Sequence, residues 1–213
     1  MYFMETSWIA KHLLAFFLLL VSLVLHEWGH AWVAYHCGDS TPKLAGRVTL
    51  NPLPHVDFLG TILFPLICIF TGGGILFGWG KPVPMNPTAF SKPWKWTLAN
   101  SAGLLGNFLL CLVASFVLTA SSQYALLAYT LLQLNAVLIA FNLLPLPGLD
   151  GFPIFQHLCR FSEETVLFLE RWGFFILLLL INLPIVRTVL FHLVEGIIAT
   201  FLRISIALYG MLG

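Results

Sequence analysis

The amino-acid sequence predicts an all-α polytopic membrane protein. Of its 213 residues, 59% are hydrophobic and 9% are charged, and the mean hydropathy is +0.93. A soluble domain carries about 25% charged residues, so this chain has too few charges to cover the surface of a soluble globule. The apolar residues also stand in long runs, which is typical of helices that cross a bilayer. We expect residues 1–213 to form a single membrane-embedded domain.

About five to six membrane segments are predicted from these runs. Their ranges are 8–35, 58–79, 97–120, 126–144, 173–186 and 188–208. A helix needs about 20 residues to cross about 30 Å of hydrocarbon. The third, fourth and sixth runs are long enough for this, whereas the fifth is marginal and is extended if it begins near Thr165. No A-x-A cleavage site follows the first run, so we expect it to be a retained helix rather than a signal peptide.

The connections between these segments differ in character. Residues 39–57 contain Gly46, three prolines and the β-type run 47–50, and they predict a short surface β-hairpin. Residues 80–96 contain four prolines and three lysines, which indicates a non-helical basic loop. Residues 120–125 carry no charge and predict a tight hairpin.

Overall charge and cysteine content exclude several classes of function. The net charge of +1 offers no electrostatic basis for a nucleic-acid partner. The four cysteines lie far apart without a CxxC pair, so we expect neither a disulfide framework nor a cysteine metal site.

The motif His26-Glu27-Trp28-Gly29-His30 carries the strongest chemical signal. Histidines at i and i+4 lie on one helix face, so both imidazoles can reach one metal ion, and Glu27 can act as a general base beside it. The alternative is a pair of packed core histidines beside a buried glutamate. Ionisable clusters at membrane depth are costly and usually functional, which favours a zinc site.

A zinc site of this kind needs a third protein ligand. Asp150 follows the fourth segment between two glycines, where an unwound helix end could turn its carboxylate inward. A turn aspartate that caps the next helix is the alternative interpretation. His157, His192 and Glu195 are the competing candidates.

Three motifs in this order resemble the site-2 protease family of intramembrane zinc metalloproteases. They are HEWGH at 26–30, SAGLLGN at 101–107 and NLLPLPGLDG at 142–151. The resemblance covers roughly residues 15–155, and residues 80–96 leave no room for the PDZ domain typical of the family. Leu104 stands where the family commonly has proline.

The resemblance implies one Zn²⁺ per chain, held by His26, His30 and Asp150. It implies Glu27 as the catalytic base and Asn142 close to the metal, where its amide could hold substrate or an oxyanion. The implied function is zinc-dependent intramembrane endopeptidase activity on membrane-spanning segments of other proteins. A non-hydrolytic metal-binding or metal-transporting membrane protein is the alternative. The motif-bearing core would be residues 8–155, and 160–210 would form accessory helices.

Three further residues are candidates for supporting the site. Asn107 ends the second motif, and His55 and Asp57 flank Val56 in a proline-rich loop. His55 and Asp57 could approach the site or shape substrate entry, although a loop Asx turn is the other interpretation of this pair.

Residues 58–79 are predicted to enter the membrane and return rather than to cross it. The helices that carry His26 and Asp150 must be parallel to share one ion, which requires residues 58–79 to begin and end on one side. Pro65 and the glycines 72–74 offer breaks for a re-entrant segment. The basic residues of the loops then lie on one side, so the positive-inside rule predicts a multi-pass protein of the cell membrane with its active site toward the cytoplasm. The sequence leaves the oligomeric state open.

Overall fold

The computed structural model describes residues 2–71 and 78–212, and within these ranges it is all-helical and contains no strand. Four helices are long and apolar enough to cross a membrane. They are α1 (Tyr2–His36), α5 (Ala102–Ala120), α6 (Ala125–Asn142) and α9 (Pro184–Leu212). The chain is therefore a multi-pass membrane protein, as its composition predicts.

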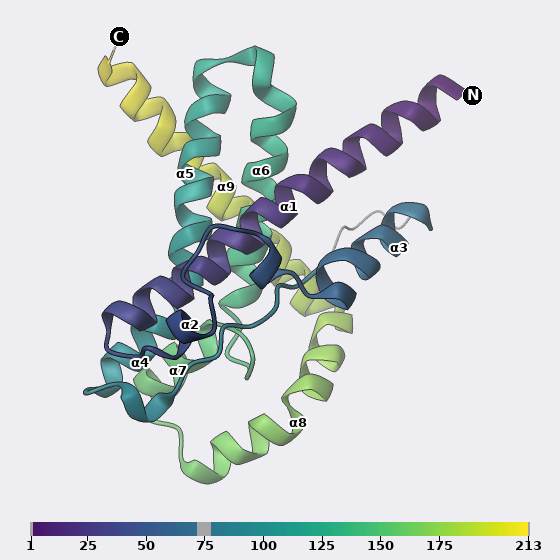
Figure 1. Ribbon diagram of the computed structural model, residues 1–213. Helices are drawn as coiled ribbons and strands as arrows, with labels where there is room; N and C mark the ends of the chain where they lie inside the picture. The colour runs from purple at the N-terminus through teal and green to yellow at the C-terminus, as the bar shows by residue number, and fades with distance from the viewer. Residues whose placement is uncertain (1, 72–77, 213) are drawn as a thin grey trace.

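Helix α5 lies at the centre of the bundle and packs against α1, α6 and α9 (Figure 1). A 3-10 turn, η4 (Ser122–Tyr124), joins it to α6, so the uncharged segment 120–125 forms the predicted tight hairpin. Leu132, Cys111 and Ala114 are buried between these helices, and Phe201 of α9 joins the same cluster.

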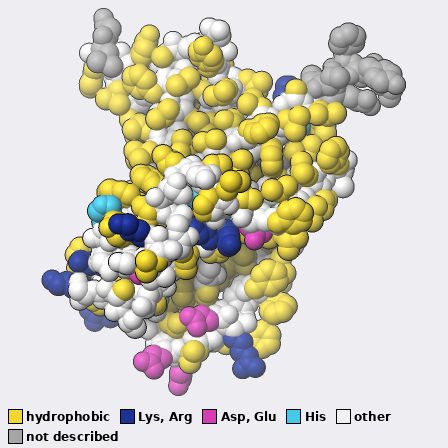
Figure 2. Space-filling view, viewed as in Figure 1, with side chains coloured by type: hydrophobic (Ala, Val, Ile, Leu, Met, Phe, Trp, Pro, Cys, Tyr) yellow, Lys and Arg dark blue, Asp and Glu magenta, His cyan; other side chains and the backbone are white. Residues whose placement is uncertain are grey.

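The helices that carry the two main motifs run in the same direction. Figure 1 shows α1 and α6 both descending toward the end of the molecule that holds α2, α4 and α7, with α5 rising beside α6. The two motifs can therefore meet at a similar depth. In Figure 2 hydrophobic side chains cover the upper part of the molecule, while most charged side chains in view gather on the lower part.

The β-hairpin predicted for residues 39–57 is wrong. This segment instead contains a short helix, α2 (Thr41–Leu44), and a 3-10 turn, η1 (Leu53–His55). Its three prolines lack the N–H groups that a strand ladder needs. Within the β-type run, the N–H groups of Arg47 and Thr49 donate to the carbonyls of Pro42 and Arg47 in local turns instead of to a second strand. The guanidinium of Arg47 donates to two carbonyls of the loop after residue 78.

The described part of the second apolar segment contains one short helix. A π-helical turn, η2 (Phe58–Leu63), continues into α3 (Phe64–Phe70), which together give an apolar helix of 58–70 that is shorter than the four spanning candidates. Pro65, one of the predicted breaks, lies just after the π-helical turn. The missing N–H of a proline is tolerated at a helix start or bulge. The glycines 72–74 lie outside the described residues.

The chain returns from this short helix to its starting point. The backbone N–H of Trp79 donates to the carbonyl of Gly60 at 3.2 Å, and the hydroxyl of Thr61 donates to the carbonyl of Trp79 at 2.7 Å. The two ends of segment 58–79 thus lie side by side, which is the arrangement that a re-entrant segment requires.

The remaining helices form the end of the molecule near the motifs. They are η3 (Pro87–Ala89), α4 (Pro93–Asn100), α7 (Gly151–Cys159) and α8 (Glu163–Asn182). Loop 80–96 therefore ends in a helix rather than remaining non-helical throughout. Helix α8 begins ten residues before 173 and close to the alternative start predicted near Thr165. Ser162 caps it by accepting from the N–H of Thr165 at 3.2 Å. It is not among the four spanning candidates.

Candidate metal centre

Two histidines from one turn of α1 form the base of the site. His26 and His30 are 6% and 7% exposed, and their Nε2 atoms lie 3.2 Å apart. Their i and i+4 spacing places both rings on the face of α1 that packs against α5. The helix therefore presents two nitrogen donors to one point.

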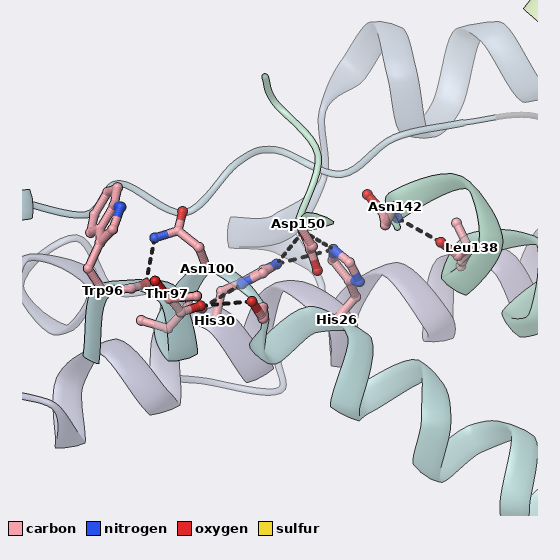
Figure 3. Close-up of polar contacts among 10 residues, drawn as sticks. His26, His30, Trp96, Thr97, Asn100, Leu138, Asn142 and Asp150 are labelled. Atoms are coloured by element: carbon pink, nitrogen blue, oxygen red, sulfur yellow. Dashed lines mark hydrogen bonds and ion pairs between the residues drawn. The ribbon is translucent and has the colours of Figure 1, made fainter. Parts of the chain in front are cut away.

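Asp150 reaches the same point from the loop after α6. Gly148 adopts a positive φ of 87° in this loop, a conformation that glycine permits without strain. The Oδ1 atom of Asp150 lies 3.2 Å from Nε2 of His30 and 3.7 Å from Nε2 of His26 (Figure 3). Asp150 is only 8% exposed. The unwound helix end thus directs a carboxylate into the protein interior.

The donor set fits a zinc ion. One ligand atom from each of the three residues lies within 4.8 Å of the others, and Asp150 Oδ2 is buried without a hydrogen-bond partner in the described chain. For Zn–N bonds of about 2.0–2.1 Å, tetrahedral ligand atoms lie about 3.3 Å apart. The observed separations are close to this value. Two imidazoles and one carboxylate also leave a fourth position, as in catalytic zinc sites.

The second ring nitrogen of His30 faces a group that fixes the orientation of the ring, whereas Nδ1 of His26 is buried without a hydrogen-bond partner among the described residues. Nδ1 of His30 donates to the carbonyl of Ala99 at 2.8 Å, which leaves Nε2 of that ring as the metal-facing lone pair. The fully buried side chain of Asn107 interacts with the ring of His26. Neither Asn107 amide atom has a partner of regular hydrogen-bond geometry among the described residues. Asn107 therefore lies beside the ring of His26, and its supporting role stays a prediction.

Glycines on α5 allow the close approach that forms the site. A Cβ atom on Gly103 would clash with both histidine rings and lie 2.6 Å from Nδ1 of His26. A Cβ atom on Gly106 would lie 2.9 Å from the carbonyl oxygen of Leu25. Small residues of this kind permit close helix packing in membranes.

Glu27 lies beside the histidine pair and is 7% exposed. A Cβ atom on Gly80 would lie 3.0 Å from the Glu27 Oε1 atom, so residue 80 forms a wall against the carboxylate. The carboxylate also interacts with the backbone N–H of Val83 and, electrostatically, with His30 and Arg47. The carboxylate thus lies between the histidines and the loop that follows residue 78.

Of the other predicted site residues, Asn142 faces the cluster and Asp57 has a separate role in the loop. Asn142 is half-buried at the end of α6 and its amide nitrogen donates to the carbonyl of Leu138 at 3.0 Å, while the residue faces the same region as Asp150 (Figure 3). Asp57 instead caps η2 by accepting from the N–H of Gly60 at 2.7 Å. The Asx interpretation therefore fits Asp57.

His55 is 1% exposed, and its Nε2 atom is 2.8 Å from the carbonyl of Thr49. Its own carbonyl accepts from the N–H of Lys81 at 2.8 Å, so it reaches the site only through the loop beside Glu27. Burial lowers the pKa of His55, and nearby Arg47 acts in the same direction.

The competing ligands are not brought to this site. His157, His192 and Glu195 are exposed, and the cluster consists of His26, His30 and Asp150 in the described part of the chain.

Sequence reasoning missed three residues that shape the site. Gly103 and Ala99 contact the histidines, and Arg47 holds the loop beside Glu27. The small residues of the 101–107 motif signal close helix packing. No sequence signal indicates which carbonyl a histidine meets or that Arg47 is buried.

Comparisons with known proteins agree with this geometry. The chain is 36% identical over 205 residues to the protein named "Putative zinc metalloprotease YwhC" of Bacillus subtilis (strain 168), with 90% of each chain covered. It is 30% identical over 185 residues to "Putative zinc metalloprotease Rip2" of Mycolicibacterium smegmatis, with 82% of this chain and 69% of that protein covered. No family model and no solved structure matches the chain.

The fold and the cluster define a multi-pass membrane protein with a buried site of two histidines and one aspartate that is suited to a metal. Together with the similarity to these named zinc metalloproteases, they place the chain in a family. The chain belongs to the site-2 protease family.

Proposed function

We propose that this chain is a zinc-dependent intramembrane endopeptidase that cleaves membrane-spanning segments of other proteins. The observation that carries the proposal is the position of Glu27, a buried carboxylate next in sequence to one ligand of the cluster and in electrostatic contact with the other histidine. Metal storage or transport needs ligands but no base beside them. The His-Glu-x-x-His arrangement therefore favours hydrolysis over the non-hydrolytic alternative.

The residues have separate roles in this mechanism. His26, His30 and Asp150 would hold the zinc ion, which when bound supplies Lewis acidity toward a water molecule and the substrate carbonyl. Glu27 accepts a proton from the attacking water as the new C–O bond forms. It then delivers that proton to the amide nitrogen as the C–N bond breaks, which leaves a carboxylic acid and an amine; transfer of the acid's remaining proton to the amine gives a carboxylate and an ammonium group.

Asn142 is proposed to hold the substrate backbone. It ends α6 just before the loop that carries Asp150. Its amide nitrogen donates one of its two hydrogens to the carbonyl of Leu138. The second hydrogen and the amide oxygen can pair with a substrate peptide group.

The substrate must unwind before it can be cleaved. A membrane helix uses its carbonyls in backbone hydrogen bonds, and exposing them in hydrocarbon is costly. Segments with glycine, proline or polar residues unwind most readily, so we expect cleavage near such residues. The products leave the bilayer more easily than the intact span does.

We further propose that the site faces the cytoplasm of a cell membrane. The loops at the motif-bearing end carry Lys43, Lys81, Lys92 and Lys95, whereas hairpin 120–125 carries no charge. Basic loops favour the cytoplasmic side. Substrates would therefore be cut near their cytoplasmic ends.

A comparison of membrane proteomes tests this proposal. Cells that express the wild-type chain are compared with cells that express Glu27→Gln, using peptide-resolved mass spectrometry of the membrane fraction. We expect single-span fragments to accumulate in the Glu27→Gln cells and to disappear with the wild type. Identical fragment patterns in both cells, together with zinc flux into vesicles that contain the purified protein, would contradict proteolysis and support transport.

A further inference from the structure

Arg47 is a buried arginine outside the metal cluster. It follows α2, its N–H donates to the carbonyl of Pro42 at 2.8 Å, and the residue is only 5% exposed. A buried guanidinium is costly unless its donors are satisfied. In the described ranges no carboxylate lies within ion-pair distance of Arg47, since the short acid–base contacts there join His26 and His30 to Asp150.

The donors of Arg47 go to two successive peptide groups of another loop. Nη1 donates to the carbonyl of Lys81 at 3.0 Å and Nη2 donates to the carbonyl of Pro82 at 2.9 Å. The planar guanidinium offers its donors in a fixed fork, so it can hold two acceptors at once. Arg47 therefore fixes the position and the rotation of this piece of backbone.

The loop that Arg47 holds lies directly against the side chain of Glu27, the proposed catalytic carboxylate. Gly80 lies against Glu27, and the N–H of Val83 interacts with the same side chain. Arg47 itself interacts electrostatically with Glu27. The Arg47 side chain thus holds residues 81–82 by hydrogen bonds. Gly80 and Val83, on either side of them, contact the general base Glu27.

Regular secondary structure does not hold this loop. Pro82 and Pro84 have no N–H groups, so the segment cannot form a continuous hydrogen-bond ladder. Backbone contacts secure it at Trp79, through Gly60, and at Lys81, through His55. Farther along, the N–H of Asn86 donates to Oδ2 of Asp39 at 2.7 Å. Between Lys81 and Asn86 the described restraints are the carbonyl contacts of Arg47 and the contact of the Val83 N–H with Glu27.

We propose that Arg47 is a positioning residue for proteolysis, which holds segment 80–83 against Glu27 and so orients the carboxylate toward the water it must deprotonate. This inference rests on the proposed function. A displacement of about 1 Å in a catalytic group can cost about 10²-fold in rate. Loss of the Arg47 fork should therefore lower kcat while leaving zinc binding and KM nearly unchanged.

The test compares Arg47→Gln and Arg47→Lys with the matched control Arg171→Gln, which alters an exposed arginine. Each purified protein is assayed for zinc content, thermal unfolding and cleavage of fluorescently labelled casein, an unstructured probe that needs no unwinding. We expect Arg47→Gln to keep its zinc and lose about 10²-fold in kcat, with KM within about threefold. Arg47→Lys should recover little activity, because one ammonium cannot reproduce the two-carbonyl fork. Arg171→Gln should behave as wild type.

A second measurement reports the accessibility of the loop directly, through a cysteine at position 83. It keeps the test valid if the Arg47→Gln protein is unstable. Val83→Cys is placed in a chain whose four native cysteines are replaced, and its rate of maleimide labelling is measured with arginine or lysine at position 47. We expect faster labelling with lysine, since the loop is released. Unchanged labelling, wild-type kcat in Arg47→Gln, or full activity in Arg47→Lys would each overturn the proposal. Absence of casein cleavage by the wild type would instead contradict the proposed function, and the labelling result would still judge the role of Arg47.

Discussion

Nε2 of His30 lies 3.2 Å from Oδ1 of Asp150, although the histidine belongs to α1 and the aspartate to the loop after α6. Nδ1 of the same histidine is committed to the carbonyl of Ala99. The metal-facing atom is therefore the one that meets the carboxylate. This relationship joins two motifs from distant parts of the chain into one candidate zinc site.

Asp150→Ala should abolish stable zinc binding. The change removes one of three converging donors and leaves two imidazoles that bind zinc much more weakly. Metal analysis of the purified protein should show a fall from about one zinc per chain toward none. Asp57→Asn is the matched control, since Asp57 caps η2, and it should keep its zinc. Equal zinc content in the Asp150→Ala and wild-type proteins would exclude Asp150 as a ligand.

Gly103→Ala should weaken the site without adding or removing a ligand. The new methyl group would meet the rings of both His26 and His30. Orienting contacts around metal ligands are worth about 10–100-fold in affinity or activity, and we expect a loss of that size in a zinc competition titration.

Gly196→Ala is the control for the same chemical change elsewhere. A Cβ atom there meets nothing within 4 Å, so this variant should bind zinc as the wild type does. If both glycine variants bound zinc equally well, the close approach of α5 to the histidines would not matter for the site.

Single cysteines should report that loops 39–57 and 80–96 share one side of the membrane. In a chain without native cysteines, Ser40→Cys and Thr88→Cys should react with an impermeant maleimide only after cells are opened. Ser122→Cys, in the uncharged hairpin, should react in intact cells. All three positions are exposed. Labelling of positions 40 and 88 from opposite sides would show that residues 58–79 cross the membrane.

The sequence predicts the metal cluster well because local rules determine most of it. The i and i+4 spacing of His26 and His30 places both rings on one face wherever a helix forms. The glycines and prolines around Asp150 indicate an unwound end, and Gly148 does adopt a positive φ there. The prediction that the helices carrying the two motifs are parallel follows from the need to share one ion, and α1 and α6 do run in the same direction (Figure 1).

Other features depend on contacts that a pattern of residue types does not contain. Residues 47–50 have β-type composition, yet they form no strand, because the N–H groups of Arg47 and Thr49 donate to the nearby carbonyls of Pro42 and Arg47 in local turns. The apolar run alone places the start of the fifth segment at 173, whereas the extended prediction near Thr165 lies within two residues of the observed start, where Ser162 caps the helix before the apolar run begins. Gly103 belongs to a motif that the sequence singles out, but its two histidine neighbours become visible only when α5 packs on α1.

The most direct test of the account is the zinc content and proteolytic rate of the Glu27→Gln protein measured on the same preparation. Glutamine keeps the size of the side chain and removes the base. We predict about one zinc per chain, as in the wild type, with casein cleavage lowered roughly 10²–10⁴-fold, while the exposed control Glu195→Gln keeps its activity. Near-normal cleavage by Glu27→Gln with zinc in place would contradict the assignment of Glu27 as the general base, and with it the central claim.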